Sequence, residues 1–564
     1  MNKKFIFLIF CSPLLLAKTL PLFFQGNQQI SERDLYNSIN LYKPFFYEFY
    51  KDQPAVESKT VPLLAQAIKD YYRSRGYFLA IVTHAMQDDS VVIEISEEAP
   101  VTVADIAKIS ELDISKNIPF VKGEVFDSNK FTQSKADIKR MYENSSYCSA
   151  GLDAKAWVDI ETNSAYLVYE AVKNEPCFFG KIVVTPPTNI DAEIIKSLLY
   201  IKEKEPFSPI EITKSYESLY RYEGISKVII DTAVDDNNSV KTTIIVSENE
   251  KPVRFQAGVG ASSDEGVMAL LGVNHRNLYG NLKTAGLTTR VTEIKQTIKT
   301  NFDMPIENRS STGAELGFEN ENFIGYKESR IFGTLYLKQR ESPHTFKESL
   351  LFDSSNTYDS GDKLLFPEGV LFVLSPKLEW GYDVRDKVLD PSHGYFFNSE
   401  IAGSWMSDIS DATYYKFKLT GGYILPLNSS ILALKATFGS LHLYQGNLPE
   451  SYLFYGGGMN SNRAYGYRRL SPTSSSGESI GSDSILDSTI EYRFPVYGDF
   501  KGVLFNDNTY LGEKEIPDYN KGYFSAGVGI RYMTPIGSVA IDFGFDMAHP
   551  TEQYALHFHV GELF

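Results

Sequence analysis

The feature that most limits the fold of this chain is an alternation of apolar and polar residues that begins after Pro252. In "PVRFQAGVGAS" the odd-numbered positions are apolar, namely Val253, Phe255, Ala257 and Val259. The even-numbered positions are polar or glycine, namely Arg254, Gln256, Gly258 and Gly260. "SVAIDFGFDM", near the end of the chain, alternates in the same way. A period of two is typical of a strand with one apolar face, so we predict β structure from residue 253 to 564.

The length of this region favours one β architecture over another. A soluble sandwich also alternates, but its aromatic faces share a single core. About 310 residues of strand and turn provide roughly sixteen antiparallel strands of about ten residues, as an outer-membrane barrel requires. Aromatic residues make up 13% of the chain, which fits a β protein and also the aromatic girdles of a membrane barrel. We therefore predict an all-β transmembrane barrel over residues 253–564.

The N-terminus predicts export. Lys3 and Lys4 precede a short apolar run that ends at Ala17, which is the layout of a secretory signal peptide over residues 1–17. Cys11 suggests a lipoprotein as an alternative, but Phe10 stands where a small residue is needed. No later run approaches the ~18 apolar residues of a spanning helix. A mature protein in a membrane would therefore cross it as a closed barrel.

Three segments before residue 253 close alike, at Pro100, Pro176 and Pro252, which are spaced by 76 residues. Each has a helical stretch, a Gly or Ser break and two alternating strands around a polar turn. The breaks are Gly76, Ser146 and Gly224. With a strand and a shorter helix in front, the unit reads β-α-α-β-β. We predict a duplicated α+β domain over residues 18–100, 101–176 and 177–252. A run of unrelated small α+β domains is the alternative.

Three motifs, in this order behind the repeats, resemble a known family. They are "HRNLYGNLKTAGLTTRV" with Asn277, Leu278 and Gly280 at its turn, "YDVRDKVLDPSHGYFF" with Asp383, Arg385, Asp386, Pro391 and Gly394, and "GGGMNSNRAYGYRRL" followed by "STIEYRFPVYGDFKGVLFNDN". The chain resembles POTRA-plus-barrel outer-membrane assembly proteins, and within them the outer-membrane half of the translocation and assembly module. The resemblance covers essentially the whole mature chain and implies that the repeats are POTRA domains.

The resemblance also implies a locked loop. In the family the sixth external loop folds into the lumen, where the arginine of an R-G-F/Y tip pairs with an acidic residue of the wall. Arg463 and Asp507 are the matching residues, and Tyr465 and Tyr467 match the aromatics of the loop. Ala464 departs from the family glycine, so a tip that needs positive φ at that position would have to be built differently, with Gly466 as one option. A surface arginine in a flexible loop is the alternative.

Closing a barrel requires its first and last strands to meet, and we call this contact the seam. The last strand, "YALHFHVGELF", is amphipathic and ends on an aromatic residue, with Glu562 expected at the membrane boundary. We predict seam residues on both strands, namely Val253, Phe255, Gly258, Gly260, Phe558, Gly561 and Phe564. Glycines weaken strand packing. The resemblance implies a weak seam that accepts a strand of a client. A permanently closed barrel whose glycines only relieve crowding is the alternative.

By this resemblance, the protein would insert or export outer-membrane and surface proteins from the outer membrane of a Gram-negative bacterium. Its partners would be unfolded clients, outer-membrane lipid and a TamB-like protein anchored in the inner membrane, with the POTRA domains in the periplasm. It would have no cofactor and no enzymatic activity. A two-partner secretion transporter is one alternative, although that family has two POTRA domains, and a passive diffusion channel is another. The net charge of −16 argues against nucleic acid as a partner.

Two local patterns match those of a catalytic or metal site, but the sequence around each of them argues against such a site. "GESIG" at Gly477 to Gly481 matches a serine nucleophile motif, but that motif needs a strand before Ser479 and a helix after it, and this stretch is a Ser-rich loop. His557 and His559 share a strand face, but they lack a third metal ligand nearby.

The sequence also predicts a disulfide. Cys148 and Cys177 are the only cysteines left after the signal peptide. If "ETNS" forms a two-residue hairpin, Glu161 lies opposite Ser164, and the same register places the two cysteines opposite each other. Such a pair lies within disulfide range, and an exported domain meets oxidising conditions.

Overall fold

The computed structural model describes residues 19–43, 53–87, 89–185, 188–388, 390–473, 479–497, 500–534 and 537–560. The expected signal peptide with Cys11 lies outside these residues, and so do Gly561, Glu562 and Phe564 of the last strand. The chain forms two compact units, the first made of Met1–Lys181, Glu203–Ile210 and Ala233–Lys241, the second of Ile182–Lys202, Glu211–Thr232 and Thr242–Phe564. The boundary therefore runs through the third repeat.

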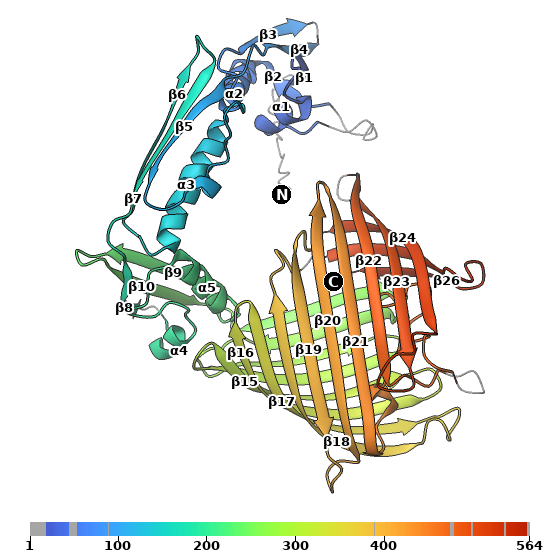
Figure 1. Ribbon diagram of the computed structural model, residues 1–564. Coiled ribbons are helices and arrows are strands. Elements are labelled where there is room, and N and C mark those ends of the chain that lie inside the picture. Colours follow the sequence, from blue (N-terminus) through green and yellow to red (C-terminus); the bar gives the residue numbers. More distant parts are fainter. Residues whose placement is uncertain are drawn as a thin grey trace, which may run out of the picture. The chain divides into compact units, whose positions relative to one another are not determined.

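Each of the first two repeats packs helices on one small sheet (Figure 1). The first repeat contains β1 (Thr19–Gln25), α1 (Glu32–Ser38), β2 (Ala55–Glu57), α2 (Val61–Ser74), β3 (Ile81–Gln87) and β4 (Ser90–Ser96), with sheet order β2-β1-β4-β3. The second contains β5 (Thr102–Ser110), α3 (Ser128–Asn144), β6 (Gly151–Asp159) and β7 (Ser164–Val172), with order β5-β7-β6. Helix α2 buries Val61, Ala65, Ile68 and Tyr72, which recur at helical spacing. No helix among the described residues is both long and apolar enough to cross a membrane.

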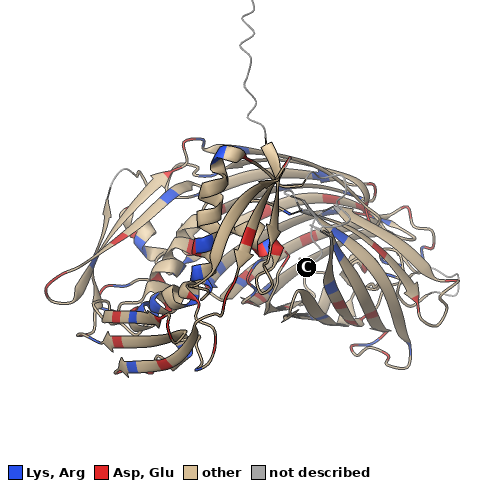
Figure 2. Cartoon of the chain, turned by 90° about the horizontal axis from the view of Figure 1, so that it is seen from above, with Lys and Arg blue, Asp and Glu red and all other residues tan. Residues whose placement is uncertain are grey.

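The third repeat comes nearest to the expected β-α-α-β-β order. It contains β8 (Phe178–Thr185), α4 (Ala192–Ser197), α5 (Pro209–Tyr220), β9 (Ile225–Val234) and β10 (Ser239–Glu248), in a sheet of order β8-β10-β9. In the second repeat a 3₁₀ turn over Ser115–Asn117 takes the place of the shorter helix. The first repeat adds the short edge strand β2. Figure 2 shows that residues of both charge signs are distributed over these helices and strands.

The three break residues all make the same contact. The Gly76 carbonyl accepts a hydrogen bond from the Val101 N–H at 2.8 Å, where the next segment begins. The Ser146 carbonyl accepts one from Cys177 at 2.7 Å, and the Gly224 carbonyl accepts one from Asn249 at 2.8 Å. The breaks are therefore joints, at which the residue after a helix binds the chain that leaves the last strand of that repeat.

A disulfide joins Cys148 and Cys177 at the second of these joints, with their Cα atoms 5.8 Å apart. The register from which we derived this bond is wrong. Ser164 lies opposite Asp159, not Glu161, because four residues form the turn. Asp159 accepts hydrogen bonds from the Glu161 N–H and the Thr162 hydroxyl, which stabilise the longer turn. Neither cysteine lies in the ladder; the joint brings them together.

Sixteen antiparallel strands form a closed barrel after the third repeat, which confirms the predicted fold (Figure 1). They are β11 (Val253–Ser262), β12 (Gly266–His275), β13 (Thr284–Val291), β14 (Lys295–Ile306), β15 (Ser310–Asn322), β16 (Lys327–Glu341), β17 (His344–Tyr358), β18 (Gly369–Asp383), β19 (Gly394–Ser404), β20 (Ala412–Leu427), β21 (Ser430–Gly446), β22 (Ser484–Tyr497), β23 (Phe500–Gly512), β24 (Gly522–Thr534), β25 (Gly537–Asp546) and β26 (Tyr554–Val560). Each strand pairs with the next along the chain.

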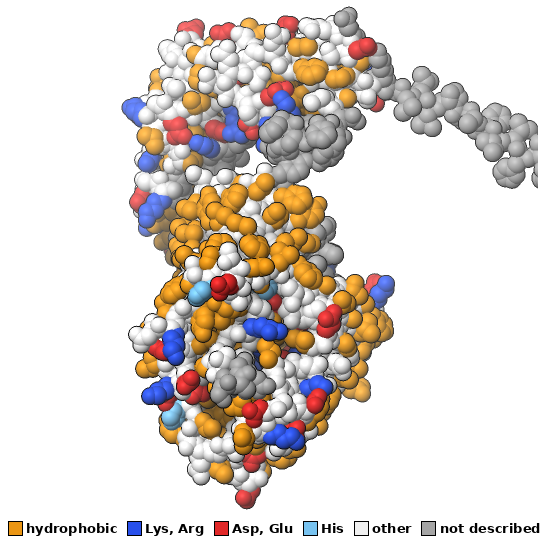
Figure 3. Space-filling view, turned by 90° about the vertical axis from the view of Figure 1, so that its right-hand side faces the viewer, with side chains coloured by type: hydrophobic (Ala, Val, Ile, Leu, Met, Phe, Trp, Pro, Cys, Tyr) orange, Lys and Arg blue, Asp and Glu red, His pale blue; other side chains and the backbone are white. Residues whose placement is uncertain are grey.

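The alternation in the sequence sets which side chains face inward. On β25, Asp542 and Asp546 are buried inside the barrel, whereas Ile541 and Phe543 are exposed outside it. On the face drawn in Figure 3, hydrophobic side chains gather over much of the barrel surface. Apolar outside and polar inside is the arrangement of a barrel in a lipid bilayer.

The barrel has two different ends. We call the end at which β11 begins the near end and the opposite end the far end. The chain turns at the far end after β11 and after every second strand from there, so residues 447–483, between β21 and β22, form a far-end loop. We call these residues the long loop.

The D-x-R-D…P-x-x-G motif builds the near-end turn between β18 and β19. The Arg385 guanidinium forks onto the Asp383 carboxylate at 2.7 and 3.0 Å and lies over the Phe396 ring. Asp386 accepts hydrogen bonds from the Ser392 hydroxyl and backbone N–H. Gly394 has a φ of +110°, a region that favours glycine. The motif therefore fixes the shape of the turn.

Candidate functional site in the barrel lumen

The long loop folds back from the far end into the barrel. Its tip, Asn462 to Ala464, is buried, and Arg463 is only 2% exposed. The residues that Arg463 contacts lie in the middle of wall strands rather than at their ends. The tip therefore occupies the lumen.

Arg463 and Asp507, which the resemblance paired, are in direct contact. The Arg463 Nε and Nη2 atoms donate to the two Asp507 oxygens at 2.9 and 2.8 Å. The backbone N–H of Arg463 donates to the same carboxylate at 3.0 Å. The guanidinium also lies 3.5 Å from the centre of the Phe505 ring. This two-pronged contact pairs the charge of the guanidinium with that of a carboxylate, and it also holds the tip in one position.

Two further acids hold Arg463, and sequence reasoning missed both. Its Nη1 atom donates to Glu491 on β22 at 2.5 Å and to Asp542 on β25 at 3.2 Å. Two wall arginines balance these charges: Arg493 contacts Glu491 at 2.9 Å, and Arg531 contacts Asp542 at 2.8 Å. Three guanidinium groups thus meet three carboxylates, as a buried charge cluster needs for neutrality. Asp542 lies in the alternating stretch "SVAIDFGFDM", and alternation alone did not predict this contact.

Glycine on the inner wall makes room for the tip. A Cβ atom at Gly544 would lie 2.4 Å from the Arg463 carbonyl oxygen. The Arg463 backbone therefore packs directly on the backbone of β25, and any side chain at residue 544 would displace it.

The neighbours of Arg463 differ in what they contact. The Tyr465 hydroxyl donates to Asp546 at 2.6 Å, and its ring meets Tyr523 edge-on. Tyr467 lies beneath the Arg468 guanidinium. Ala464 is fully buried without positive φ, so this tip has no need of the family glycine there. The positive-φ residues of this stretch are Gly457, Gly458 and Arg468, and not Gly466 as we expected.

The seam lies between β11 and β26, as the closed barrel requires. Among the described residues, one ladder pair joins these strands, Ser262 with His559. The Ser263 N–H also donates to the Phe558 carbonyl at 3.1 Å. The predicted β11 residues, Val253, Phe255, Gly258 and Gly260, pair with β12 and have no described partner on β26. Phe558 therefore lies at the seam. The residues after Val560 lie outside the described part of the chain, so the seam contacts of Val253, Phe255, Gly258 and Gly260 stay a prediction.

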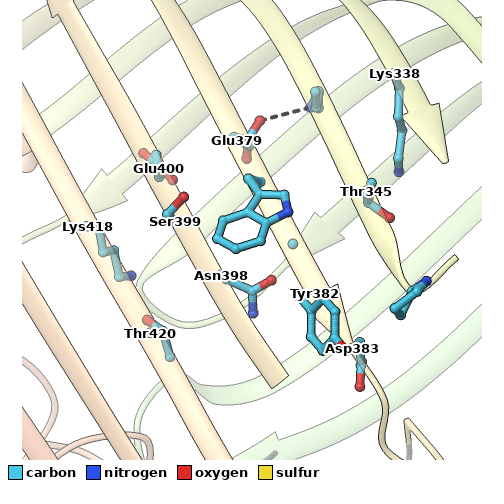
Figure 4. Close-up of a pocket in the computed structure, with 14 residues that line it drawn as sticks. Lys338, Thr345, Glu379, Tyr382, Asp383, Asn398, Ser399, Glu400, Lys418 and Thr420 are labelled. Carbon is cyan, nitrogen blue, oxygen red and sulfur yellow. Dashed lines mark ion pairs between the residues drawn. The ribbon is translucent and has the colours of Figure 1, made fainter. Parts of the chain in front are cut away.

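A polar cavity of about 590 Å³ lies against the inner wall over β16 to β20 (Figure 4). Figure 4 shows Lys338 and Lys418 at its opposite margins, with Glu379 and Glu400 between them. Lys377 pairs with both glutamates, at 3.3 and 3.0 Å. The cavity is therefore a charged, water-accessible part of the lumen.

The two patterns that suggested chemistry have structural roles. Ser479 is buried and its hydroxyl contacts that of Ser471; Gly477 and Glu478 of the motif lie outside the described residues. His557 is bound by the Ser263 hydroxyl at 2.9 Å, and His559 pairs with Ser262 across the seam. No group of three or more His, Cys, Asp and Glu in the described part of the chain is placed to hold a metal ion.

A closed sixteen-stranded barrel behind α+β repeats, with a lumenal arginine lock, defines a class of outer-membrane protein. A model described as the Omp85 superfamily domain matches residues 271–564. The chain belongs to the Omp85 superfamily.

Individual relatives are distant. The chain is 20% identical over 579 residues to the outer membrane protein assembly factor BamA of Nitratidesulfovibrio vulgaris, covering 96% of this chain and 72% of that protein. It resembles the crystal structure of Haemophilus ducreyi BamA lacking POTRA domains 1–3, with a TM-score of 0.58 and 15% identity over 81% of this chain and 99% of that one. CdiB from Acinetobacter baumannii matches with a TM-score of 0.50 and 12% identity over 82% of this chain and 90% of that one.

Proposed function

We propose that this protein assembles or exports outer-membrane and surface proteins through its seam. The observation that carries the proposal is the way in which the barrel closes. Strands β11 and β26, the first and the last of the barrel, meet at the seam, whereas every other junction joins strands that follow each other along the chain. Such a junction can open without undoing a hairpin, and a strand edge that it exposes can accept a strand of another chain.

The proposed mechanism is exchange of backbone hydrogen bonds, without covalent chemistry or a cofactor. A client strand pairs with the edge of β11 that the opened seam exposes, so each bond that the seam loses is replaced by one to the client. The exchange is close to neutral in free energy, and the completed client barrel then separates. Unfolded clients and the surrounding lipid are the partners of this step.

Within the superfamily we propose that the chain acts as TamA, the outer-membrane half of the translocation and assembly module. The three repeats and the order of the three motifs support this assignment. The repeats would lie in the periplasm and bind a TamB-like protein anchored in the inner membrane. The distant similarity to BamA supports the broader role in outer-membrane protein assembly.

A two-partner secretion transporter is the second candidate, and the fold likeness to CdiB favours it. The three repeats argue against it, because that family has two POTRA domains. A passive channel is the third candidate, but such a channel would carry no repeats of this kind.

Depletion of the protein, followed by quantitative proteomics of the outer membrane, tests the proposal. We expect a defined set of barrel and surface proteins to fall while their transcripts stay constant. A passive channel would leave the outer-membrane proteome unchanged. Loss of one secreted protein alone would favour the secretion transporter.

A further inference from the structure

The long loop is anchored on both sides of the seam. On one side, Arg463 binds Asp507 and Asp542, on strands that lead to β26. On the other side, the backbone N–H of Met459 donates to Asp264 at 3.0 Å. Asp264 lies in the far-end turn directly after β11. The loop thus bridges the two strands that the seam joins.

Asp264 contacts the seam itself as well as the loop. Its Oδ1 atom lies 3.3 Å from Nδ1 of His557, on β26, while Oδ2 accepts the Met459 N–H. The neighbouring Ser263 hydroxyl lies 2.9 Å from the same histidine nitrogen. His557 is 2% exposed, so this contact is shielded from solvent. One carboxylate therefore joins β11, β26 and the long loop.

The approach of the loop to Asp264 requires a glycine. A Cβ atom at Gly458 would lie 2.8 Å from Asp264 Oδ2, and Gly458 has a φ of +97°. The Gly458 N–H donates to the Tyr465 carbonyl at 2.9 Å, which ties this contact to the Arg463 tip. The loop is therefore shaped to seat on Asp264.

We propose that Asp264 is the positioning residue through which the long loop holds the seam closed. The inference rests on the proposed function of the seam. The contacts of Asp264 and Ser263 with His557 add a side-chain link beside the Ser262–His559 pair, where β11 meets β26. Release of the loop from Asp264 frees the far end of β11 for a client strand.

Thiol labelling of Ser262→Cys in the purified full-length protein, without clients, tests this directly. Ser262 is 4% exposed, so a maleimide reaches a cysteine there only when the seam opens. We expect Asp264→Ala and Gly458→Ala each to raise the labelling rate by about tenfold, because each removes or displaces a charge-assisted hydrogen bond. Glu265→Gln is the matched control, because the ion pair of Glu265 is with Arg290 on β13 and not with a residue of β26. Its rate should stay at that of the parent.

A double variant tests whether Arg463 acts on the seam through Asp264. Arg463→Ala should also raise the labelling rate, but it should add little in a protein that already carries Asp264→Ala. Asp264→Asn, which keeps an acceptor for Met459, should give an intermediate rate, and heat-modifiable migration on gels confirms that each barrel is folded. A rate for Asp264→Ala within twofold of the parent, or an equal rise in Glu265→Gln, would overturn the proposal. Neither result bears on whether clients pair with β11, because clients are absent.

Discussion

At the scale of single residues, the ion cluster around Arg463 shows which contacts a sequence motif predicts and which it does not. The motif paired Arg463 with Asp507, and these residues are in contact at 2.8 Å. Glu491 and Asp542 were missed because the resemblance implies no such pairing for them, and their distance from the tip depends on how deeply the loop enters the barrel. Alternation assigns a residue to the inner face of the barrel, but it does not give the position of that residue along the barrel axis relative to the loop.

Arg463→Ala and Asp507→Ala should each impair client assembly while the barrel still forms. Removing one member of a buried ion cluster costs about 3–5 kcal/mol, because the other charges stay buried. The double variant should be little worse than either single one, since both remove the same contact. Growth and client levels in a depleted strain measure the effect. Losses that add would contradict the pairing.

A residue in the first repeat gives a pH-dependent prediction. Burial alone would raise the pKa of Glu97, but hydrogen bonds from the Tyr72 hydroxyl and the Gln29 and Ile30 N–H groups lower this pKa below its ordinary value. A carboxyl group whose pKa is lowered in the folded state stabilises the fold at pH values above its ordinary pKa. This stabilisation is lost as the pH falls through the lowered pKa.

We therefore expect Glu97→Gln to reduce the protection of the Gln29 and Ile30 amides from hydrogen exchange by roughly tenfold near neutral pH, since hydrogen bonds to a charged group are worth about 1.5–3 kcal/mol. The difference from wild type should shrink as pH falls below about 4.5, the usual glutamate value. Thr162→Ser, in the second repeat, serves as a control. A difference that stays constant with pH would exclude the role of the charge.

At the scale of elements, the strands and helices followed from periodicity, but the joints between repeats did not. Gly76, Ser146 and Gly224 were recognised as breaks, yet their shared carbonyl contact depends on where the chain runs after the last strand of each repeat. The disulfide pairing was predicted from a hairpin register that proved wrong, because the Asp159 carboxylate stabilises a longer turn.

Replacing Cys148 and Cys177 by serine should loosen the joint between the second and third repeats. A disulfide that closes a loop of this length contributes about 2–4 kcal/mol. The backbone bond between Cys177 and Ser146 remains, so limited proteolysis should cut residues 173–176 faster while the barrel stays folded. Reduction of wild-type protein should give the same result. Labelling of both cysteines in non-reduced protein would contradict the disulfide.

At the scale of the whole molecule, the length of the alternating region was enough to predict sixteen strands and closure. It could not predict the register of the seam, because closure fixes which strands meet but not their stagger. The pairing of Ser262 with His559 depends on the register of every other ladder in the barrel. The opening of this seam is the central claim of our account, since client pairing depends on it.

Locking the seam tests that claim most directly. Ser262→Cys and His559→Cys place cysteines at directly opposite positions, where oxidation can join the strands. Val259→Cys with Ala269→Cys, across the β11–β12 ladder, is the matched control that leaves the seam free. The account predicts that the oxidised seam pair blocks client assembly in a depleted strain without changing barrel abundance, that reduction restores assembly, and that the control pair has no effect. Normal client levels with a fully locked seam would contradict it.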